Sequence, residues 1–221
     1  MYIELVDSLR CLEPHEETWL VAAVTRMDGR HIVEGKLGCP VCRREYAVRA
    51  GVAWFSQRQP GAVEPSLTIA GVATDETAIM RAGALLGLGE AGGIVVLGGA
   101  WTGFADAVAG LGAAHAVVLN MQANDESPQE VSSVVVDDRL PFRTGALRAV
   151  ALDAALATPP LLASAASGLR SRGRLVAPAD ASVPENVAVL ARDETDWVGE
   201  RVAVASPPVA LRSGRIPPWA A

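Results

Sequence analysis

The sequence has few cysteines, few aromatic residues, a single lysine and no excess of positive charge. Three cysteines in 221 residues are too few, and odd in number, for a disulfide-built framework. Lys and Arg total 19 against 25 Asp and Glu, a net charge of −6, so the chain as a whole lacks the basic field that nucleic acids require. Half of the residues are hydrophobic, which suffices to bury a core. We therefore expect a globular protein in a reducing compartment, with a cytoplasmic location.

Long hydrophobic runs are also missing. The most apolar region, residues 91–121, is interrupted by Asp106, His115 and several glycines, whereas a spanning helix needs about 20 apolar residues. The opening residues, MYIELVDSLR, are too acidic for a signal peptide. We expect no membrane span, and peripheral association with a membrane complex through a partner stays open.

The chain divides into two parts of different composition. Residues 1–55 hold all three cysteines and two of the three histidines, while residues 67–221 hold no cysteine and most of the net negative charge. Residues 56–66, SQRQPGAVEPS, are polar and contain two prolines and a glycine, which is typical of a linker. We predict a small N-terminal domain at 1–55, a linker at 56–66, an α/β domain at 67–205 and a proline-rich tail at 206–221.

The second part alternates short apolar runs with amphipathic stretches. This alternation predicts βαβ units and a doubly wound, mostly parallel, Rossmann-like sheet. Helical faces are expected at Ile79–Ala82–Leu86, after an Asp75 cap, at Phe104–Val108–Leu111 and at Leu162–Ala165–Leu169. The expected strands lie at 94–97, 117–119, 134–136, 149–152 and 174–177.

The end of the α/β part follows a different pattern. Only nine residues, two of them proline, separate Ala177 from Val187, which is too few for a helical crossover between parallel strands. Residues 187–191 and 201–204 are therefore predicted to pair as antiparallel strands.

Cys11, His15, Cys39 and Cys42 have the spacing of a metal site. Structural zinc takes four ligands in a tetrahedron, usually as two short-spaced pairs, and Cys-x2-Cys supplies one such pair from a tight turn. Residues 27–30 between the pairs resemble a hairpin turn, so the first domain is predicted to be a β-rich zinc ribbon. Three alternatives stay open: His31 as the fourth ligand, ordinary buried thiols, or a Cys39–Cys42 redox pair.

The segment from Glu34 to Val52 resembles a known family. Its pattern, Glu-Gly-x-Leu-x-Cys-Pro-x-Cys-x3-Tyr-x4-Gly-Val, is similar to the C-terminal knuckle of the small zinc-ribbon proteins that activate methyltransferases. Ala47 stands where that family has proline, and the Cys11–His15 pair replaces its usual first cysteine pair. The resemblance implies a protein that docks on another protein, and some bacterial members of the family lack the metal.

The second part resembles the class I S-adenosylmethionine-dependent methyltransferases. Residues 94–104 match the first strand and glycine-rich turn of that family, and residues 140–142 and 169–176 match two later segments in the same order. The resemblance implies an S-adenosylmethionine site. The positions that would contact the cofactor are Gly98, Ala100, Thr102, Gly103, Asn120 and Asp138.

Departures from the family pattern fall on these cofactor positions. Ala100 and Thr102 replace glycines that let the backbone approach the ligand, and Trp101 adds a large ring. Asn120 replaces the carboxylate that holds the ribose hydroxyls, which removes a charge-assisted hydrogen bond. We interpret Asp153 as a solvated carboxylate at a strand end, and no catalytic residue is predicted.

The sequence therefore predicts a zinc-binding accessory or scaffold protein with a degenerate cofactor site, which acts through contacts with another protein. The ribbon edge and the tail are the candidate contact elements. One alternative is an active methyltransferase that carries its own activator-like zinc domain. Another is a nucleic-acid binder that uses Arg43, Arg44 and Arg49, which the balanced charge of the ribbon disfavours.

Overall fold

The structure is a computed structural model that describes residues 1–56, 68–69, 73, 75–112, 114–122 and 130–202. The predicted linker beyond Ser56 and the predicted tail at 206–221 lie outside the described residues. The helices are η1 (Ile3–Ser8), α1 (Glu76–Leu86), η2 (Gly99–Phe104), α2 (Ala105–Gly112) and α3 (Pro159–Gly168). The strands are β1 (Val21–Asp28), β2 (His31–Gly38), β3 (Glu45–Arg49), β4 (Val52–Trp54), β5 (Thr68–Ile69), β6 (Ile94–Gly98), β7 (His115–Leu119), β8 (Met121–Gln122), β9 (Val131–Val135), β10 (Leu147–Leu152), β11 (Leu169–Pro178), β12 (Val187–Arg192) and β13 (Asp196–Arg201).

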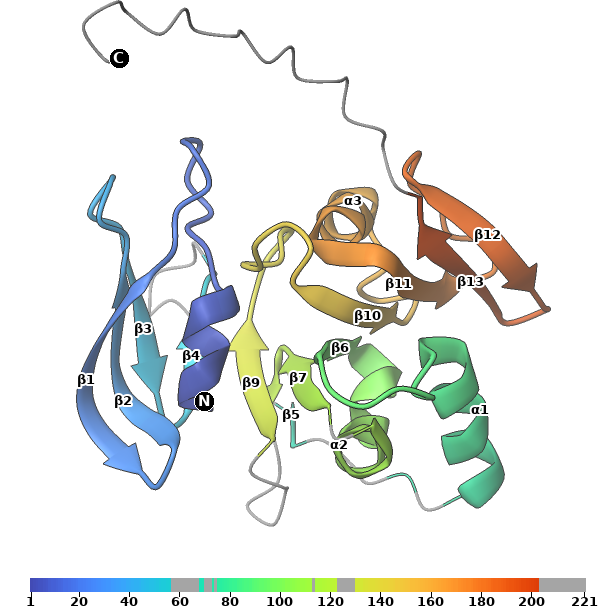
Figure 1. The fold of residues 1–221 in the computed structure, drawn as a ribbon, viewed down its shortest axis with the longest axis horizontal. Helices are drawn as coiled ribbons and strands as arrows, with labels where there is room; N and C mark the ends of the chain where they lie inside the picture. The colour runs from blue at the N-terminus through green and yellow to red at the C-terminus, as the bar shows by residue number, and fades with distance from the viewer. Residues whose placement is uncertain (57–67, 70–72, 74, 113, 123–129, 203–221) are drawn as a thin grey trace, which may run out of the picture.

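One eleven-stranded sheet runs through the protein in the order β1-β2-β3-β4-β9-β7-β6-β10-β11-β13-β12 (Figure 1). The five strands from β9 to β11 are parallel and follow the 3-2-1-4-5 order of doubly wound folds. The hairpin of β12 and β13 joins this core antiparallel, with β13 against β11. The predicted mixed α/β architecture with a mostly parallel sheet is therefore confirmed.

The N-terminal part forms the other end of the same sheet. β1 and β2 pair antiparallel around a turn in which Gly29 has a φ of 52°, as the hairpin prediction requires. β4 then pairs in parallel with β9, so strands β1–β4, the predicted ribbon, continue directly into the α/β part (Figure 1). The N-terminal segment binds the α/β part too, because Leu9 bridges to Phe142. The predicted parts thus share one sheet.

Hydrophobic clusters cover the two faces of the central strands. The first unites α1 and α2 with alternate strand residues such as Val95 and Leu97. The second unites α3 with Val96 and Val150, and it continues into η1 and the ribbon through Leu5 and other buried side chains. The central strands read as continuously apolar because both faces are covered in this way.

Three local predictions differ from the structure. The second strand of the C-terminal pair begins at Asp196 rather than at residue 201, because its hairpin turn is short. Leu111 is 57% exposed, so only Val108 of the predicted face is fully covered. Leu169 is the first residue of β11 and does not belong to α3.

None of the described helices is long and apolar enough to span a membrane.

Candidate functional site

The four predicted metal ligands converge at one end of the ribbon. The ligand atoms of Cys11, His15, Cys39 and Cys42 all lie within 4.8 Å of one another. Cys11 Sγ is 3.6 Å from Cys42 Sγ, and Cys39 Sγ is 3.4 Å from His15 Nε2. Around tetrahedral zinc, with Zn–S near 2.3 Å and Zn–N near 2.0 Å, neighbouring ligand atoms stand about 3.5–3.8 Å apart. The donor set and the spacing therefore fit a zinc ion with four protein ligands, which is the arrangement of a structural site.

Backbone hydrogen bonds bring the two ligand pairs together. Cys39 and Cys42 lie in a turn after β2 that is closed by bonds from Arg43 N to Cys39 O and from Cys39 N to Arg44 O. Arg43 has a φ of 63°, a left-handed conformation that tightens this turn. Cys11 sits in the segment after η1, next to Arg10, whose N–H donates to Pro141 of the α/β part. A metal here would fasten a segment held by the α/β part to the ribbon.

The surroundings distinguish the ligands electrostatically. Burial raises the pKa of the Cys11 thiol to about 11. Burial also acts on Cys39, but the backbone N–H groups of Cys42 and Val41 outweigh it and lower the pKa of Cys39 to about 7. His15 Nδ1 lies 2.7 Å from the Glu16 carbonyl, which only accepts hydrogen bonds, so Nδ1 carries the proton and Nε2 faces the thiols.

Tyr46 supports the cluster from behind. Its hydroxyl accepts the Leu12 N–H at 3.0 Å, and its oxygen lies 3.4 Å from Cys11 Sγ. Because the oxygen already accepts a bond, the hydroxyl proton is free to point at the sulfur. The sequence placed Tyr46 only within the family motif and gave no sign of this role, since the contact joins residues 35 positions apart.

Replacing Tyr46 with phenylalanine is expected to lower the affinity for zinc by about 10–100-fold, the usual effect of losing a group that orients a ligand. Competition with a chromophoric chelator measures the change. Tyr2→Phe is the matched control, because the Tyr2 hydroxyl bonds Arg30 and lies outside the cluster. Equal zinc affinity in the Tyr46 variant and the control would contradict this role.

The predicted cofactor turn lies between the carboxyl ends of β6 and β10. The strand order reverses at this point, and open α/β sheets bind their ligands there. β6 ends at Gly98 and leads into η2, while β10 ends at Leu152, directly before Asp153. The Asp153 carboxylate accepts the Ala100 N–H at 2.8 Å and the Ala155 N–H at 3.1 Å. The Asp153 carboxylate thus lies against the backbone at the start of η2.

Gly99 shows how closely this carboxylate approaches the backbone. Its φ is 65°, and a Cβ at this position would overlap the carboxylate of Asp153. The bare backbone that a cofactor needs is present, but an acidic side chain of the protein already lies against it. Asp153 is a partly exposed carboxylate at a strand end, as interpreted, but the sequence did not indicate that it accepts two backbone hydrogen bonds.

Three of the other predicted cofactor residues form hydrogen bonds within the chain. The buried Thr102 hydroxyl donates to the Gly99 carbonyl at 2.7 Å, and Asn120 Oδ1 accepts the Val136 N–H at 2.8 Å. Gly103 O accepts the Ala73 N–H at 2.7 Å. Asp138 follows β9 and is exposed. Trp101 packs into the core of this face, with its ring 5.7 Å from that of Phe104. Thr102, Asn120 and Gly103 thus have hydrogen-bond partners within the chain, and the binding role of the predicted cofactor residues stays a prediction.

No family model matches the sequence, and no curated protein sequence is similar to it. Several solved structures share part of its backbone arrangement. The antibiotic-resistance methyltransferase Kmr is 14% identical, with 62% of this chain and 100% of that chain covered and a TM-score of 0.40. A putative S-adenosyl-L-methionine-dependent methyltransferase from Methanococcus maripaludis is 11% identical, with 57% and 85% covered and a TM-score of 0.39. A phospholethanolamine N-methyltransferase 2 from Haemonchus contortus is 13% identical, with 48% and 28% covered and a TM-score of 0.39.

Proposed function

We propose that this protein is a zinc-binding accessory protein with a methyltransferase-like α/β fold, and that it acts through contacts with another protein rather than by methyl transfer. The observation that carries the proposal is the 2.8 Å hydrogen bond from Ala100 N–H to Asp153. It lies at the strand-order reversal, where a cofactor would have to sit. Hydrogen bonds to a charged group contribute about 1.5–3 kcal/mol each, so a ligand at this turn has to displace a favourable contact first.

The cluster of Cys11, His15, Cys39 and Cys42 supports zinc as the resident metal. All four positions are filled by protein ligands, which leaves no position for a substrate or a reactive water. Zinc at this place would hold the ribbon against the segment that precedes it. The chemistry that it supplies is therefore folding free energy.

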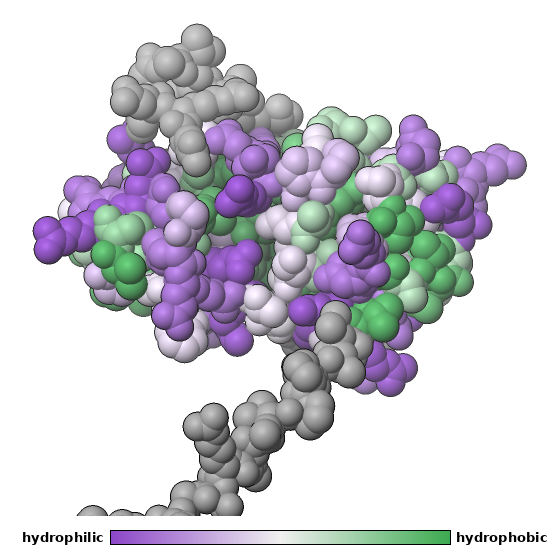
Figure 2. Space-filling model, turned by 90° about the horizontal axis from the view of Figure 1, so that it is seen from above, coloured by the Kyte–Doolittle hydropathy of each residue, from purple (hydrophilic) through white to green (hydrophobic). Residues whose placement is uncertain are grey.

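The outer edge of the ribbon supports a role in protein contacts. Among the described residues β1 pairs only with β2, so its second edge carries unpaired backbone groups. Trp19, Val21, Val24 and Met27 are exposed on or beside this strand. An open edge with apolar side chains suits a partner that adds a strand to the sheet. Seen from above, hydrophobic residues (green) form separate groups at the two ends of the molecule, surrounded by hydrophilic residues (purple) (Figure 2).

Calorimetric titration with S-adenosylmethionine tests the missing cofactor function. We expect no binding heat from the wild-type protein at about 1 mM ligand, because Asp153 occupies the turn. Asp153→Ala, titrated in parallel, reports whether the carboxylate is what excludes the ligand. Micromolar binding by the wild type, together with methyl transfer, would establish the second candidate, an active methyltransferase. The retained left-handed turn at Gly99 is the observation that favours that candidate.

A further inference from the structure

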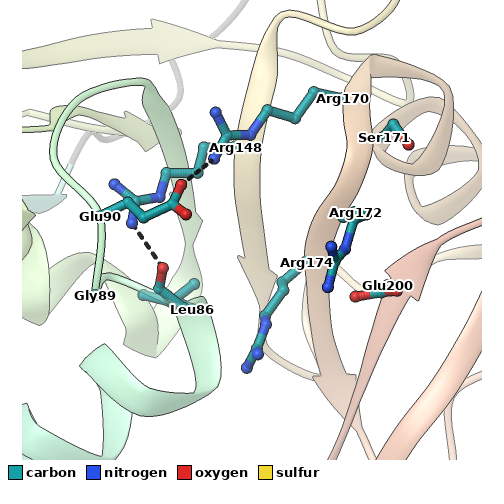
Figure 3. A pocket seen from close by; sticks show the side chains of 10 residues that line it. Leu86, Gly89, Glu90, Arg148, Arg170, Ser171, Arg172, Arg174 and Glu200 are labelled. Atoms are coloured by element: carbon teal, nitrogen blue, oxygen red, sulfur yellow. Dashed lines mark hydrogen bonds and ion pairs between the residues drawn. The ribbon is translucent and has the colours of Figure 1, made fainter.

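A cavity of about 540 Å³ lies at the amino-terminal ends of the central strands, whereas the cofactor turn lies at their carboxyl-terminal ends. It is formed by the amino-terminal ends of β10 and β11 and by the loop that follows α1 (Figure 3). Four arginines line it, Arg148, Arg170, Arg172 and Arg174, together with Glu90 and Glu200. Such a concentration of positive side chains is unexpected in a chain with a net charge of −6.

Arg148 is the buried member of this group, with 3% of its surface exposed. Its two terminal nitrogens donate to the carbonyls of Gly92 and Gly87, at 2.7 and 2.6 Å. Its Nε is buried and has no hydrogen-bond partner among the residues that the structure describes. Burial, and then the charge of Arg170, lower the pKa of Arg148. Arg148 is therefore a fixed guanidinium in the lining of the cavity, and its buried Nε–H has no partner among the described residues.

Irregular strand pairing directs these arginines into the cavity. Leu147 pairs with Leu169 and Ala149 pairs with Arg174, so one residue on β10 faces four on β11. That single residue is Arg148, and the extra residues on β11 include Arg170 and Arg172. Bulges of this kind re-aim side chains and are common beside functional sites. Arg172 also has a φ of 61°, a conformation that costs a non-glycine residue free energy.

Helix capping explains only part of this arrangement. Arg148 and Arg174 bond carbonyls at the end of α1, among them Ala84 O at 3.0 Å, and so satisfy groups that a helix end leaves open. Within the described part of the chain, Arg170 has one ion pair, at 3.8 Å with the largely exposed Glu90. The Arg172 side chain makes no hydrogen bond or ion pair with any residue in the described ranges. Two guanidinium groups are therefore still available to a ligand.

We propose that this cavity binds the phosphate group of a small phosphorylated molecule. Four arginines and two glutamates give the lining a formal charge of +2, which matches a doubly charged phosphate. The planar guanidinium fork fits phosphate oxygens in pairs, and the volume falls in the range of about 300–1,000 Å³ that small-molecule sites occupy. Because the cavity and the Asp153 turn lie at opposite ends of the central strands, this proposal does not depend on the proposed function.

Pyrophosphate is a suitable probe for the full-length zinc-loaded protein. Calorimetry at low salt is expected to give a dissociation constant below about 1 mM that weakens as salt is added. Arg170→Gln and Arg172→Gln are each expected to weaken binding by about 10-fold or more, the loss of one charged contact. Arg192→Gln is the matched control, because Arg192 is an exposed arginine on β12 that does not line the cavity. The Arg148 Nε–H resonance should shift on titration.

The outcomes separate clearly. Binding that Arg170→Gln and Arg172→Gln weaken, while Arg192→Gln leaves it unchanged, supports the proposal. Absence of binding at about 10 mM pyrophosphate, or equal weakening in all three variants, overturns it. Binding of a single-stranded oligonucleotide through these same arginines, without binding of pyrophosphate, also overturns it and favours a nucleic-acid surface. Circular dichroism of each variant verifies that the fold is retained.

Discussion

Replacing Cys39 with serine is expected to yield protein without stoichiometric zinc and with a melting temperature lower by roughly 10 °C or more. Cys39 is buried, and its sulfur lies 3.4 Å from His15 Nε2 within the cluster. Its loss removes one of the thiolates that zinc needs and leaves a polar hydroxyl in a buried place. The segment around Cys11 would then lose its metal link to the ribbon. Metal analysis by mass spectrometry and thermal unfolding measure the two effects.

Histidine variants provide the matched controls for this prediction. His15→Gln is expected to weaken zinc binding, because Nε2 of His15 faces Cys39. His31→Gln is expected to keep one zinc per chain, because His31 lies in β2 and is not part of the cluster. If the Cys39→Ser protein retained its zinc and melted at the wild-type temperature, the assignment of the cluster as a structural site would be wrong.

Replacing Gly99 with alanine is expected to destabilise the protein by about 2 kcal/mol, about 1 kcal/mol from the backbone conformation and about 1 kcal/mol from the loss of a partly exposed hydrogen bond. Two effects add at this position. The φ of 65° is unfavourable for any residue with a Cβ, and that Cβ would overlap the Asp153 carboxylate. Relief requires the carboxylate to leave Ala100, which breaks the hydrogen bond at the start of η2. Urea unfolding measures the loss of stability.

Gly29→Ala separates these two effects. Gly29 also has a positive φ, 52°, but a Cβ there meets nothing within 4 Å. The Gly29→Ala control should therefore lower the free energy of unfolding by about 1 kcal/mol, through the unfavourable backbone conformation alone. Adding Asp153→Ala to Gly99→Ala should recover part of the loss, since the overlap disappears. Equal destabilisation by Gly99→Ala and Gly29→Ala would show that Asp153 does not press against the turn.

Local patterns were enough to predict the elements that depend on neighbouring residues. The hairpin around Gly29, the Asp75 cap of α1 and the alternation of strands and helices follow from turn chemistry and hydrophobic periodicity. The grouping of four metal ligands followed from their spacing, because a Cys-x2-Cys turn places its sulfurs together.

Contacts between residues far apart in the sequence could not be predicted from local patterns. A short apolar run marks β9 as a strand, but no local pattern specifies that it pairs with β4 and so joins the two parts. Asp153 meets Ala100 across 53 positions, and the spacing of neither residue indicates the contact. The cavity around Arg148 depends on bulges in strand register, which a periodic pattern does not reveal.

The backbone amide of Ala100 offers the most direct test of the closed cofactor turn. In an NMR titration of the isotope-labelled protein with S-adenosylmethionine, its resonance should stay in place, because its hydrogen bond to Asp153 is retained. A saturable shift of the Ala100 and Gly99 amides, with a dissociation constant in the micromolar range, would contradict the account and place a cofactor at this turn.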